Sequence, residues 1–314
     1  MLISPSHARA YVVCFLAAHC AAVLAAPDAP SAYSARRRAF HTKVSEGPSR
    51  PSAAQTPPPE IYEKVKYAGP LGYHNTAYIT PLRADGKKRP AIVWIHGGLN
   101  WGIGGFAWAP APRTNDQSAR AFREAGLVEM LPSLRGCNDN LGGREYFLGE
   151  VDDVLAAIDF VRKRADVDPD RVYLGGHSTG ATLALLVAAS RPPVRAVFAF
   201  GPVASIKSYG RTQTALDYAA DEELSIRSPA TWLSEVTAPV FIIEGDQGGN
   251  AAEFEALRAA ARKAPVRFLL VRGATHFSTL APVTELLAKR AMREAAESVP
   301  LDLTDADIAA LSQR

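Results

Sequence analysis

Ser178 lies at the centre of a G-x-S-x-G pattern that begins at Gly176 and ends at Gly180. A strand-like run, residues 171–174, precedes the pattern, and a helix-like run, residues 181–189, follows it. A tight turn from strand to helix forces the central serine into a strained backbone conformation and tolerates only small neighbours. The strain lifts the hydroxyl clear of the sheet, where a base can reach it. The sequence therefore predicts a nucleophilic serine here, and the alternative is a Gly-Ser-rich turn without chemistry.

Several stretches around this serine are similar to a known family. They are residues 132–136, 150–154 and 167–172 before the serine, and residues 228–229 and 238–240 after it. Together with the serine pattern, they resemble the α/β-hydrolase superfamily and, within it, the catalytic domain of the prolyl oligopeptidase family, over roughly residues 61–295. Two positions depart from that family: Ala181 replaces its usual glycine, and Gly248 stands where its G-x-x-D motif would place an acid.

His276 is the expected general base. The resemblance implies a catalytic triad in the chain order serine, acid, histidine. Of the seven histidines, only His276 follows Ser178. It comes shortly after an apolar run at residues 266–271, so we expect it on a loop just past a core strand.

The acid of the triad is expected near the end of the apolar run at residues 239–243. We prefer Asp246, because it lies past the strand end in a glycine-rich turn that can point back toward His276. Glu244 is the alternative, since it is closer to the strand and can reach the imidazole from there. The acid would hold the imidazole in one tautomer and stabilise the imidazolium that forms during the reaction.

An H-G-G stretch at residues 96–98 supplies the expected oxyanion hole. It follows an apolar run at residues 91–95, about eighty residues before the serine pattern. The resemblance implies that one backbone amide comes from this loop, at Gly98 or Leu99, and the other from Thr179.

Strand-like and helix-like runs alternate along the chain, which favours an α/β-hydrolase fold, a mostly parallel sheet with helices on both faces. We expect one catalytic domain over residues 61–314. Its helices are expected at about residues 116–125, 147–164, 179–190, 250–263 and 280–297. The insertion between the strands at 194–200 and 239–243 is under forty residues. It can hold a small helical cap but not the β-propeller that the prolyl oligopeptidase family carries.

The first sixty residues differ in composition from the rest. Residues 11–26 are apolar and alanine-rich, follow Arg9, and are shorter than the roughly 20 residues that a membrane span needs. We therefore expect residues 1–26 to be a signal peptide and the protein to be secreted or periplasmic, without stable membrane insertion after cleavage. An uncleaved N-terminal anchor is the alternative. Residues 27–60 are rich in Ser, Pro and Arg and are expected to form a disordered linker.

The charge pattern gives no sign of a nucleic-acid partner. Residues 1–60 carry six Lys and Arg against three Asp and Glu, whereas residues 61–314 carry 29 of each. The net charge of +3 therefore comes from the leader and the linker, where we expect residues 36–38, three consecutive arginines, to be solvated. A balanced domain favours neither a nucleic acid nor an anionic surface as partner.

Signals for cysteine chemistry, metals and cofactors are few. Cys14 and Cys20 lie in the leader, which leaves Cys137, and we expect an inert buried thiol there. No histidine–carboxylate cluster has metal-ligand spacing and no G-x-G-x-x-G follows a strand, so we expect no metal and no cofactor. Aromatic residues that either line an apolar substrate pocket or pack in the core are Trp101, Trp108, Tyr146, Phe147 and Tyr209.

The sequence thus predicts a serine hydrolase in which His276 activates Ser178 for attack on an ester or amide carbonyl, with an acyl-enzyme intermediate. The resemblance favours a short-peptide peptidase, and the missing propeller favours a carboxylesterase acting on small molecules. The competing class is a catalytically inactive binding protein with the same fold. That hypothesis rests on the irregular segment 244–250, where an acid would be the first residue lost.

Overall fold

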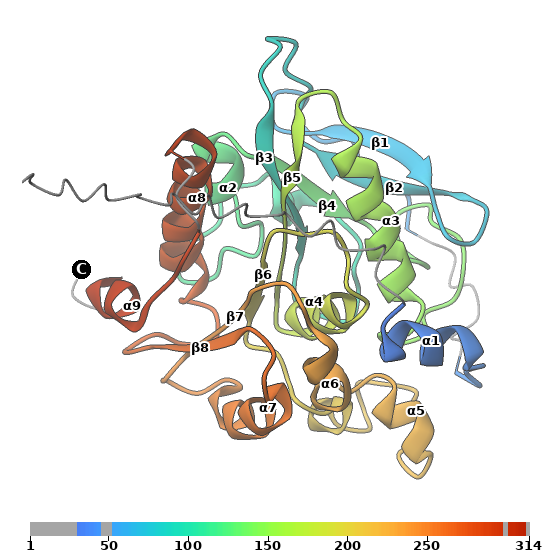
Figure 1. The fold of residues 1–314 in the computed structure, drawn as a ribbon. Coiled ribbons are helices and arrows are strands. Elements are labelled where there is room, and N and C mark those ends of the chain that lie inside the picture. Colours follow the sequence, from blue (N-terminus) through green and yellow to red (C-terminus); the bar gives the residue numbers. More distant parts are fainter. Residues whose placement is uncertain (1–29, 45–51, 298–300, 312–314) are drawn as a thin grey trace, which may run out of the picture.

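One eight-stranded sheet forms the centre of the molecule (Figure 1). A computed structural model of the chain describes residues 30–44, 52–297 and 301–311. Within these residues the strand order is β1-β2-β4-β3-β5-β6-β7-β8, and β3 to β8 run parallel while β1 and β2 are antiparallel to their neighbours. The strands are β1 (Glu63–Ala68), β2 (His74–Ile79), β3 (Arg89–Ile95), β4 (Val128–Pro132), β5 (Val167–His177), β6 (Val197–Phe200), β7 (Val240–Gly245) and β8 (Val266–Val271).

The central strands are buried on both faces, which explains their continuous apolar runs. In β3, Val93 packs into the hydrophobic cluster on one face of the sheet, while Ile92 and Trp94 pack into the cluster on the other. Parallel strands covered by helices on both sides need apolar side chains at every position, because successive side chains point to opposite faces. The predicted α/β-hydrolase fold is confirmed.

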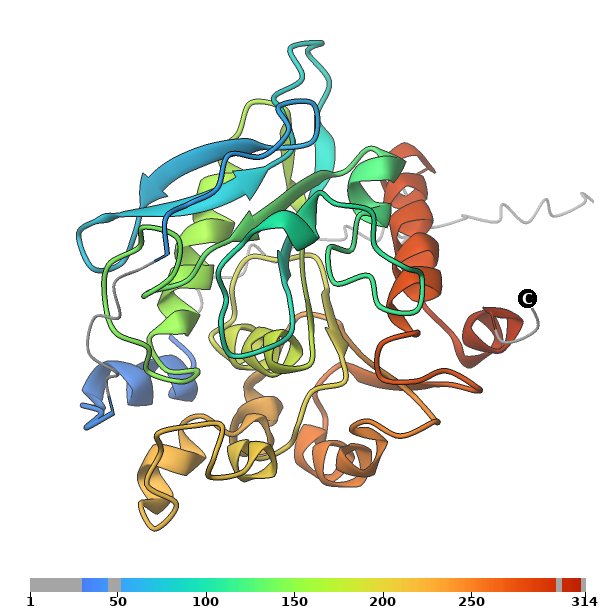
Figure 2. The same cartoon turned by 180° about the vertical axis from the view of Figure 1, so that it is seen from behind.

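Helices cover both faces of the sheet (Figures 1 and 2). One face carries α3 (Glu150–Arg162), α4 (Thr179–Ala189), α6 (Pro229–Trp232) and α7 (Phe254–Ala261), and the other carries α2 (Ala121–Ala125), α8 (Leu280–Glu297) and α9 (Asp305–Leu311). Every residue of α4 is buried, since this helix lies between the sheet, α3 and α6. The expected helices are present, and the largest difference is that α2 begins at Ala121 rather than near residue 116.

The insertion between β6 and β7 is a chain of short helices, as expected for a small cap. It contains η2 (Ile206–Tyr209), α5 (Asp221–Ser225), α6 and η3 (Leu233–Glu235). One further single-turn helix, η1 (Gly105–Ala107), lies in the loop after β3, and another, η4 (Ala251–Glu253), precedes α7.

The prediction of a disordered linker is wrong for residues 30–44, and over residues 52–60 the structure contains no helix or strand. Residues 32–39 form helix α1 (Ala32–Ala39), whose Tyr33 is fully buried with its ring 5.1 Å from that of Trp232. Ser31 caps this helix by accepting a hydrogen bond from the Ser34 amide at 3.1 Å. The expected signal peptide, residues 1–26, lies outside the described residues.

The N-terminal segment is also fastened to the cap through polar groups. The Glu223 carboxylate accepts hydrogen bonds from Thr42 Oγ1 at 2.9 Å and from the Lys43 amide at 2.8 Å. The Arg227 guanidinium is fully buried and donates to Thr42 Oγ1 at 2.7 Å. Arg37, which we expected to be solvated, has a side chain only 7% exposed and forms an ion pair with Asp152 at 2.6 Å.

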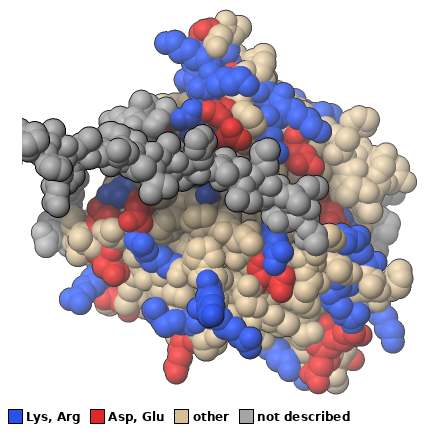
Figure 3. Space-filling view, viewed as in Figure 1, with Lys and Arg blue, Asp and Glu red and all other residues tan. Residues whose placement is uncertain are grey.

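Charges of both signs are mixed on the face of the molecule shown in Figure 3. This mixture agrees with the balanced count over residues 61–314. Among the helices of the described ranges, none is both long enough and apolar enough to cross a bilayer.

Glu129 on β4 makes the stability of this fold depend on pH. It is fully buried, it accepts a hydrogen bond from Tyr62 Oη at 2.6 Å, and burial raises its pKa from 4.5 to about 8. The folded state therefore keeps a proton that the unfolded chain loses above pH 4.5. The contribution to stability is full below that pH and is lost as the pH rises toward 8, by about 1.4 kcal/mol per pH unit.

We expect Glu129→Gln, which mimics the protonated acid, to remove this loss. Denaturant unfolding at pH 5 and pH 8 would measure the free energy of unfolding of both proteins. As the pH rises, the free energy of unfolding of the variant should increase relative to that of the wild type. Contributions from other titrating groups are the same in both proteins and cancel in the comparison. An equal pH dependence in the two proteins would contradict the assignment.

Candidate active site

Ser178 occupies the turn between β5 and α4 in the strained conformation that its sequence pattern predicts. Its backbone angles are φ 55° and ψ −116°, and its amide donates to the Phe200 carbonyl on the neighbouring strand at 2.7 Å. Ser178 as a whole is only partly buried. A Cβ at Gly180 would lie 2.2 Å from the Ile95 carbonyl oxygen, and one at Gly176 would lie 2.5 Å from the Gly180 carbonyl carbon. The two glycines therefore allow the close approach that the turn requires.

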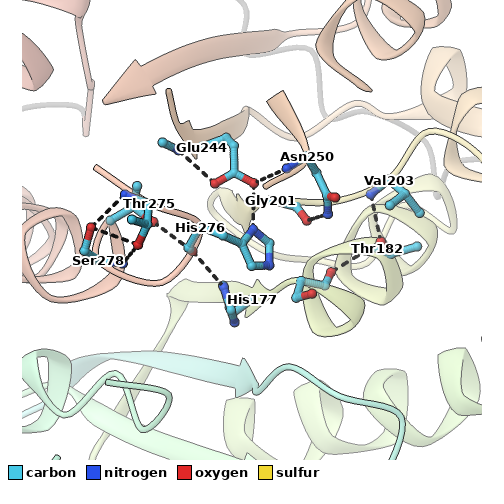
Figure 4. Close-up of polar contacts among 12 residues, drawn as sticks. His177, Thr182, Gly201, Val203, Glu244, Asn250, Thr275, His276 and Ser278 are labelled. Atoms are coloured by element: carbon cyan, nitrogen blue, oxygen red, sulfur yellow. Dashed lines mark hydrogen bonds and ion pairs between the residues drawn. The ribbon is translucent and has the colours of Figure 1, made fainter. Parts of the chain in front are cut away.

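His276 lies on the loop after β8 and is held by Glu244, as Figure 4 shows. Its Nδ1 is 2.7 Å from Glu244 Oε2, and the Glu244 side chain is fully buried. Because the carboxylate can only accept, Nδ1 carries the proton in this pair and Nε2 is left with its lone pair. The pair thus sets the tautomer that a general base needs.

The preference for Asp246 as the acid is wrong in this geometry, and the alternative, Glu244, makes the contact. Asp246 is fully exposed, and its Oδ1 accepts a hydrogen bond from the Gly273 amide at 2.7 Å. Its carboxylate therefore faces the β8 turn rather than His276. Glu244 is still within β7, on the same face as Val240 and Ile242, so the alternation of the strand aims its side chain at the histidine.

The surroundings of Glu244 are shaped to hold a carboxylate. Oε1 accepts from the Gly245 amide at 2.8 Å, and Oε2 also accepts from the Asn250 amide at 2.9 Å. Asn250 Nδ2 in turn donates to the Gly201 carbonyl at 2.8 Å (Figure 4). Gly201 has φ 64°, and a Cβ there would lie 2.4 Å from His276 Cε1, so only glycine leaves room for the pair.

The H-G-G loop lies against the first turn of α4, where the sequence places the oxyanion hole. Thr179 Oγ1 donates to the Gly98 carbonyl at 2.5 Å and so fastens the loop to the residue after the serine. The Gly97 amide already donates to Gln117 Oε1 at 3.2 Å. The amides of Gly98 and Leu99, one of which we expect to be the loop donor, follow directly, and Thr179 is at the N-terminus of α4, where amides lack intrahelical partners.

The five predicted pocket aromatics divide into two groups. Trp101, Phe147 and Tyr209 form a row, with ring centroids 5.3 Å apart for the first pair and 5.7 Å for the second. Trp101, Phe147 and Tyr146 are almost fully buried in the core, so packing is their main role. Trp108 instead packs on Tyr78 in the cluster on the other face of the sheet.

Tyr209 is the member of this row that comes near the nucleophile. Its hydroxyl is 2.7 Å from Thr182 Oγ1, and Thr182 donates its amide to the Ser178 carbonyl at 3.0 Å. Thr182 Oγ1 also accepts from the Val203 amide at 3.1 Å, which ties the start of the cap to α4 (Figure 4).

Cys137 is a buried free thiol, as expected. Burial raises its pKa, and its Sγ lies 3.3 Å from Asn100 Oδ1. A thiol with a raised pKa forms little thiolate, so it is a poor nucleophile.

Sequence reasoning missed three residues that support the site, namely Asn250, Gln117 and His177. A signal existed for His177, because it is a polar residue at the end of a strand-like run that must be buried. A buried polar side chain needs a hydrogen-bond partner, so a polar residue at such a position is a candidate for a role in the site.

Comparisons with known families agree with this fold. The chain matches the BD-FAE family model over residues 79–196 and the Dienelactone hydrolase family model over residues 143–297. An uncharacterized protein of Mycobacterium tuberculosis (strain ATCC 25618 / H37Rv) is 32% identical over 187 residues, which cover 56% of this chain and 61% of the relative. The chain thus matches about three fifths of that relative's length.

Solved structures show the same fold at low sequence identity. A puromycin-hydrolyzing peptidase of Mycobacterium tuberculosis has a TM-score of 0.60 and 17% identity, with 76% of this chain and 40% of that chain covered. An esterase from the archaeon Pyrobaculum calidifontis has a TM-score of 0.57 and 19% identity, with 76% of this chain and 87% of that chain covered.

The fold, the strained serine and the family matches define the class of protein. The chain belongs to the α/β-hydrolase superfamily. Its similarity to the Dienelactone hydrolase family, over residues 143–297, which include Ser178, Glu244 and His276, supports a hydrolase.

Proposed function

We propose that this protein is a serine hydrolase that cleaves an ester or amide bond through an acyl-enzyme. The observation that carries the proposal is the hydrogen bond between His276 and the buried Glu244, at the same sheet edge as the strained Ser178. Burying a carboxylate is costly unless it is paired and hydrogen-bonded, and the His276 imidazole is one of the three partners that hold Glu244.

In the proposed mechanism, His276 Nε2 takes the proton from Ser178 Oγ as that oxygen attacks the substrate carbonyl carbon. The negative charge that develops on the carbonyl oxygen is held by the amide of Thr179 and by one amide of the loop at Gly98 or Leu99. Glu244 stabilises the imidazolium without taking its proton. His276 then protonates the leaving group, and water, activated by the same histidine, releases the acyl group.

We expect small esters to be the first substrate class. The esterase neighbour is matched over 87% of its length, and the Dienelactone hydrolase family model covers the serine, the acid and the histidine. Peptidases are also among the structural neighbours, including the puromycin-hydrolyzing peptidase, which makes short peptide amides the second class to test.

The contact between Glu244 and His276 also favours an enzyme over an inactive binding protein. The inactive alternative rested on the irregular turn after β7. In the structure this turn closes on the carboxylate through the Asn250 amide, at 2.9 Å from Glu244 Oε2. A lost catalytic acid would leave that amide and the His276 Nδ1–H without a charged acceptor.

Covalent labelling tests the proposal directly. A fluorophosphonate probe should react with the folded protein, and mass spectrometry should place the adduct on Ser178. Ser178→Ala and heat-denatured protein should remain unlabelled, because the probe reports an activated serine rather than a serine as such. A well-folded protein that stays unlabelled, or carries the adduct elsewhere, would contradict the proposal.

A further inference from the structure

His177, the residue before the nucleophile, is buried at the point where three loops of the site meet. His177 is fully buried, and the centroid of its ring lies 4.5 Å from that of the His276 ring. The mechanism proposed above does not use this side chain. A buried imidazole that made no useful contact would destabilise the fold, because its polar nitrogens lose their hydration.

The first contact of His177 is with the loop that carries the base. Its Nε2 is 3.0 Å from the His276 carbonyl oxygen (Figure 4). A carbonyl oxygen only accepts, so Nε2 must carry the proton. Burial, and then the neighbouring His276, lower the pKa of His177 to about 3, so the ring is neutral and keeps this one proton at pH 7.

The second contact leads to the oxyanion loop. His177 Nδ1 lies 2.9 Å from Gln117 Oε1, the same oxygen that accepts the Gly97 amide proton at 3.2 Å. With the ring proton on Nε2, Nδ1 has no hydrogen to donate to this oxygen, so the two side chains are in contact here without a hydrogen bond. Gln117 is itself fixed, since its main-chain carbonyl accepts from Trp94 Nε1 at 2.9 Å. The imidazole therefore links the serine turn to the His276 loop through one hydrogen bond, and on its other side it only packs against Gln117, which holds the loop of Gly97.

We propose that His177 is a positioning residue that sets the place of His276 relative to Ser178. The inference rests on the proposed serine hydrolase function. Glu244 fixes the ring of His276 through Nδ1, whereas His177 fixes its main chain through the carbonyl oxygen. Two separate points of attachment determine both the rotation of the imidazole and its distance from the serine turn. Since His177 directly precedes Ser178, the base loop is attached to the same turn that carries the nucleophile.

Three substitutions of His177 separate its two contacts. The side-chain nitrogen of glutamine lies about as far from the main chain as the imidazole Nε2. Glutamine should therefore keep the hydrogen bond to the His276 carbonyl oxygen. Asparagine reaches only as far as Nδ1 and should keep the contact with Gln117 alone. Leucine fills a similar space and makes neither polar contact. Asparagine is thus the matched control for glutamine, since both are neutral carboxamides.

With p-nitrophenyl acetate as substrate, we expect kcat to fall about 10- to 100-fold in His177→Leu and His177→Asn, with KM nearly unchanged, because a small displacement of a catalytic group costs this much. His177→Gln should restore most of the activity. The rate of fluorophosphonate labelling should follow kcat. The low-field ¹H NMR signal of the His276 Nδ1 proton should persist in His177→Gln and shift or broaden in the other two.

Thermal unfolding shows whether each variant is folded, and if His177→Leu does not fold, the asparagine and glutamine variants carry the test. Equal kcat in those two variants, whether both high or both low, would overturn the inference. Loss of activity in Ser178→Ala with wild-type activity in every His177 variant would remove the inference and leave the proposed function standing. Wild-type activity in Ser178→Ala would remove the proposed function itself.

Discussion

Ser178→Ala is expected to reduce the turnover of a small ester by about 10⁶-fold, the loss typical when the nucleophile of a serine hydrolase is removed. The oxyanion donors remain, so a small residual rate above the uncatalysed reaction should persist. Alanine has the same Cβ as serine, so the strained backbone at φ 55° is not made worse by the change. Steady-state kinetics with p-nitrophenyl acetate, beside a thermal unfolding curve, would measure the effect.

Ser208→Ala is a suitable control for this variant. Ser208 is an exposed serine of the cap whose hydroxyl donates to Glu253 at 2.8 Å, away from the proposed chemistry. It should keep wild-type kinetics. If Ser178→Ala and Ser208→Ala lose equal activity, Ser178 is not the nucleophile.

Glu244→Gln is expected to lower kcat by about four orders of magnitude, as removal of the charge on a triad acid does elsewhere. Glutamine has the shape of glutamate, but its uncharged amide can no longer stabilise the imidazolium. Its NH₂ group can also face Nδ1 of His276 and favour the wrong tautomer. The measurement is kcat for the same ester, with folding checked by circular dichroism, because Glu244 also accepts two backbone amides.

Asp246→Asn provides the matched control, as the same change of charge two residues further along the chain. Asp246 is fully exposed, so its substitution should alter stability little and leave kcat close to that of the wild type. A larger loss of kcat in Asp246→Asn than in Glu244→Gln would return the role of the acid to Asp246.

The sequence alone was sufficient to place Ser178 in its strained turn. That conformation depends on local chemistry, since the flanking strand, the helix and the two glycines at residues 176 and 180 lie within a few residues of it. His276 could be chosen because chain order leaves one histidine after the serine. The α/β class could be predicted because buried parallel strands leave long apolar runs.

The tertiary structure decided the features that depend on residues distant in the chain. Glu244 and Asp246 are two residues apart, and only the end of β7 and its pairing beside β8 determine which carboxylate reaches His276. Tyr33 looked like part of a disordered linker because the apolar surface that buries it includes Trp232, about two hundred residues later. The composition of a segment is a local property of the sequence. Whether the segment is buried depends on the surface that the folded remainder of the chain forms around it.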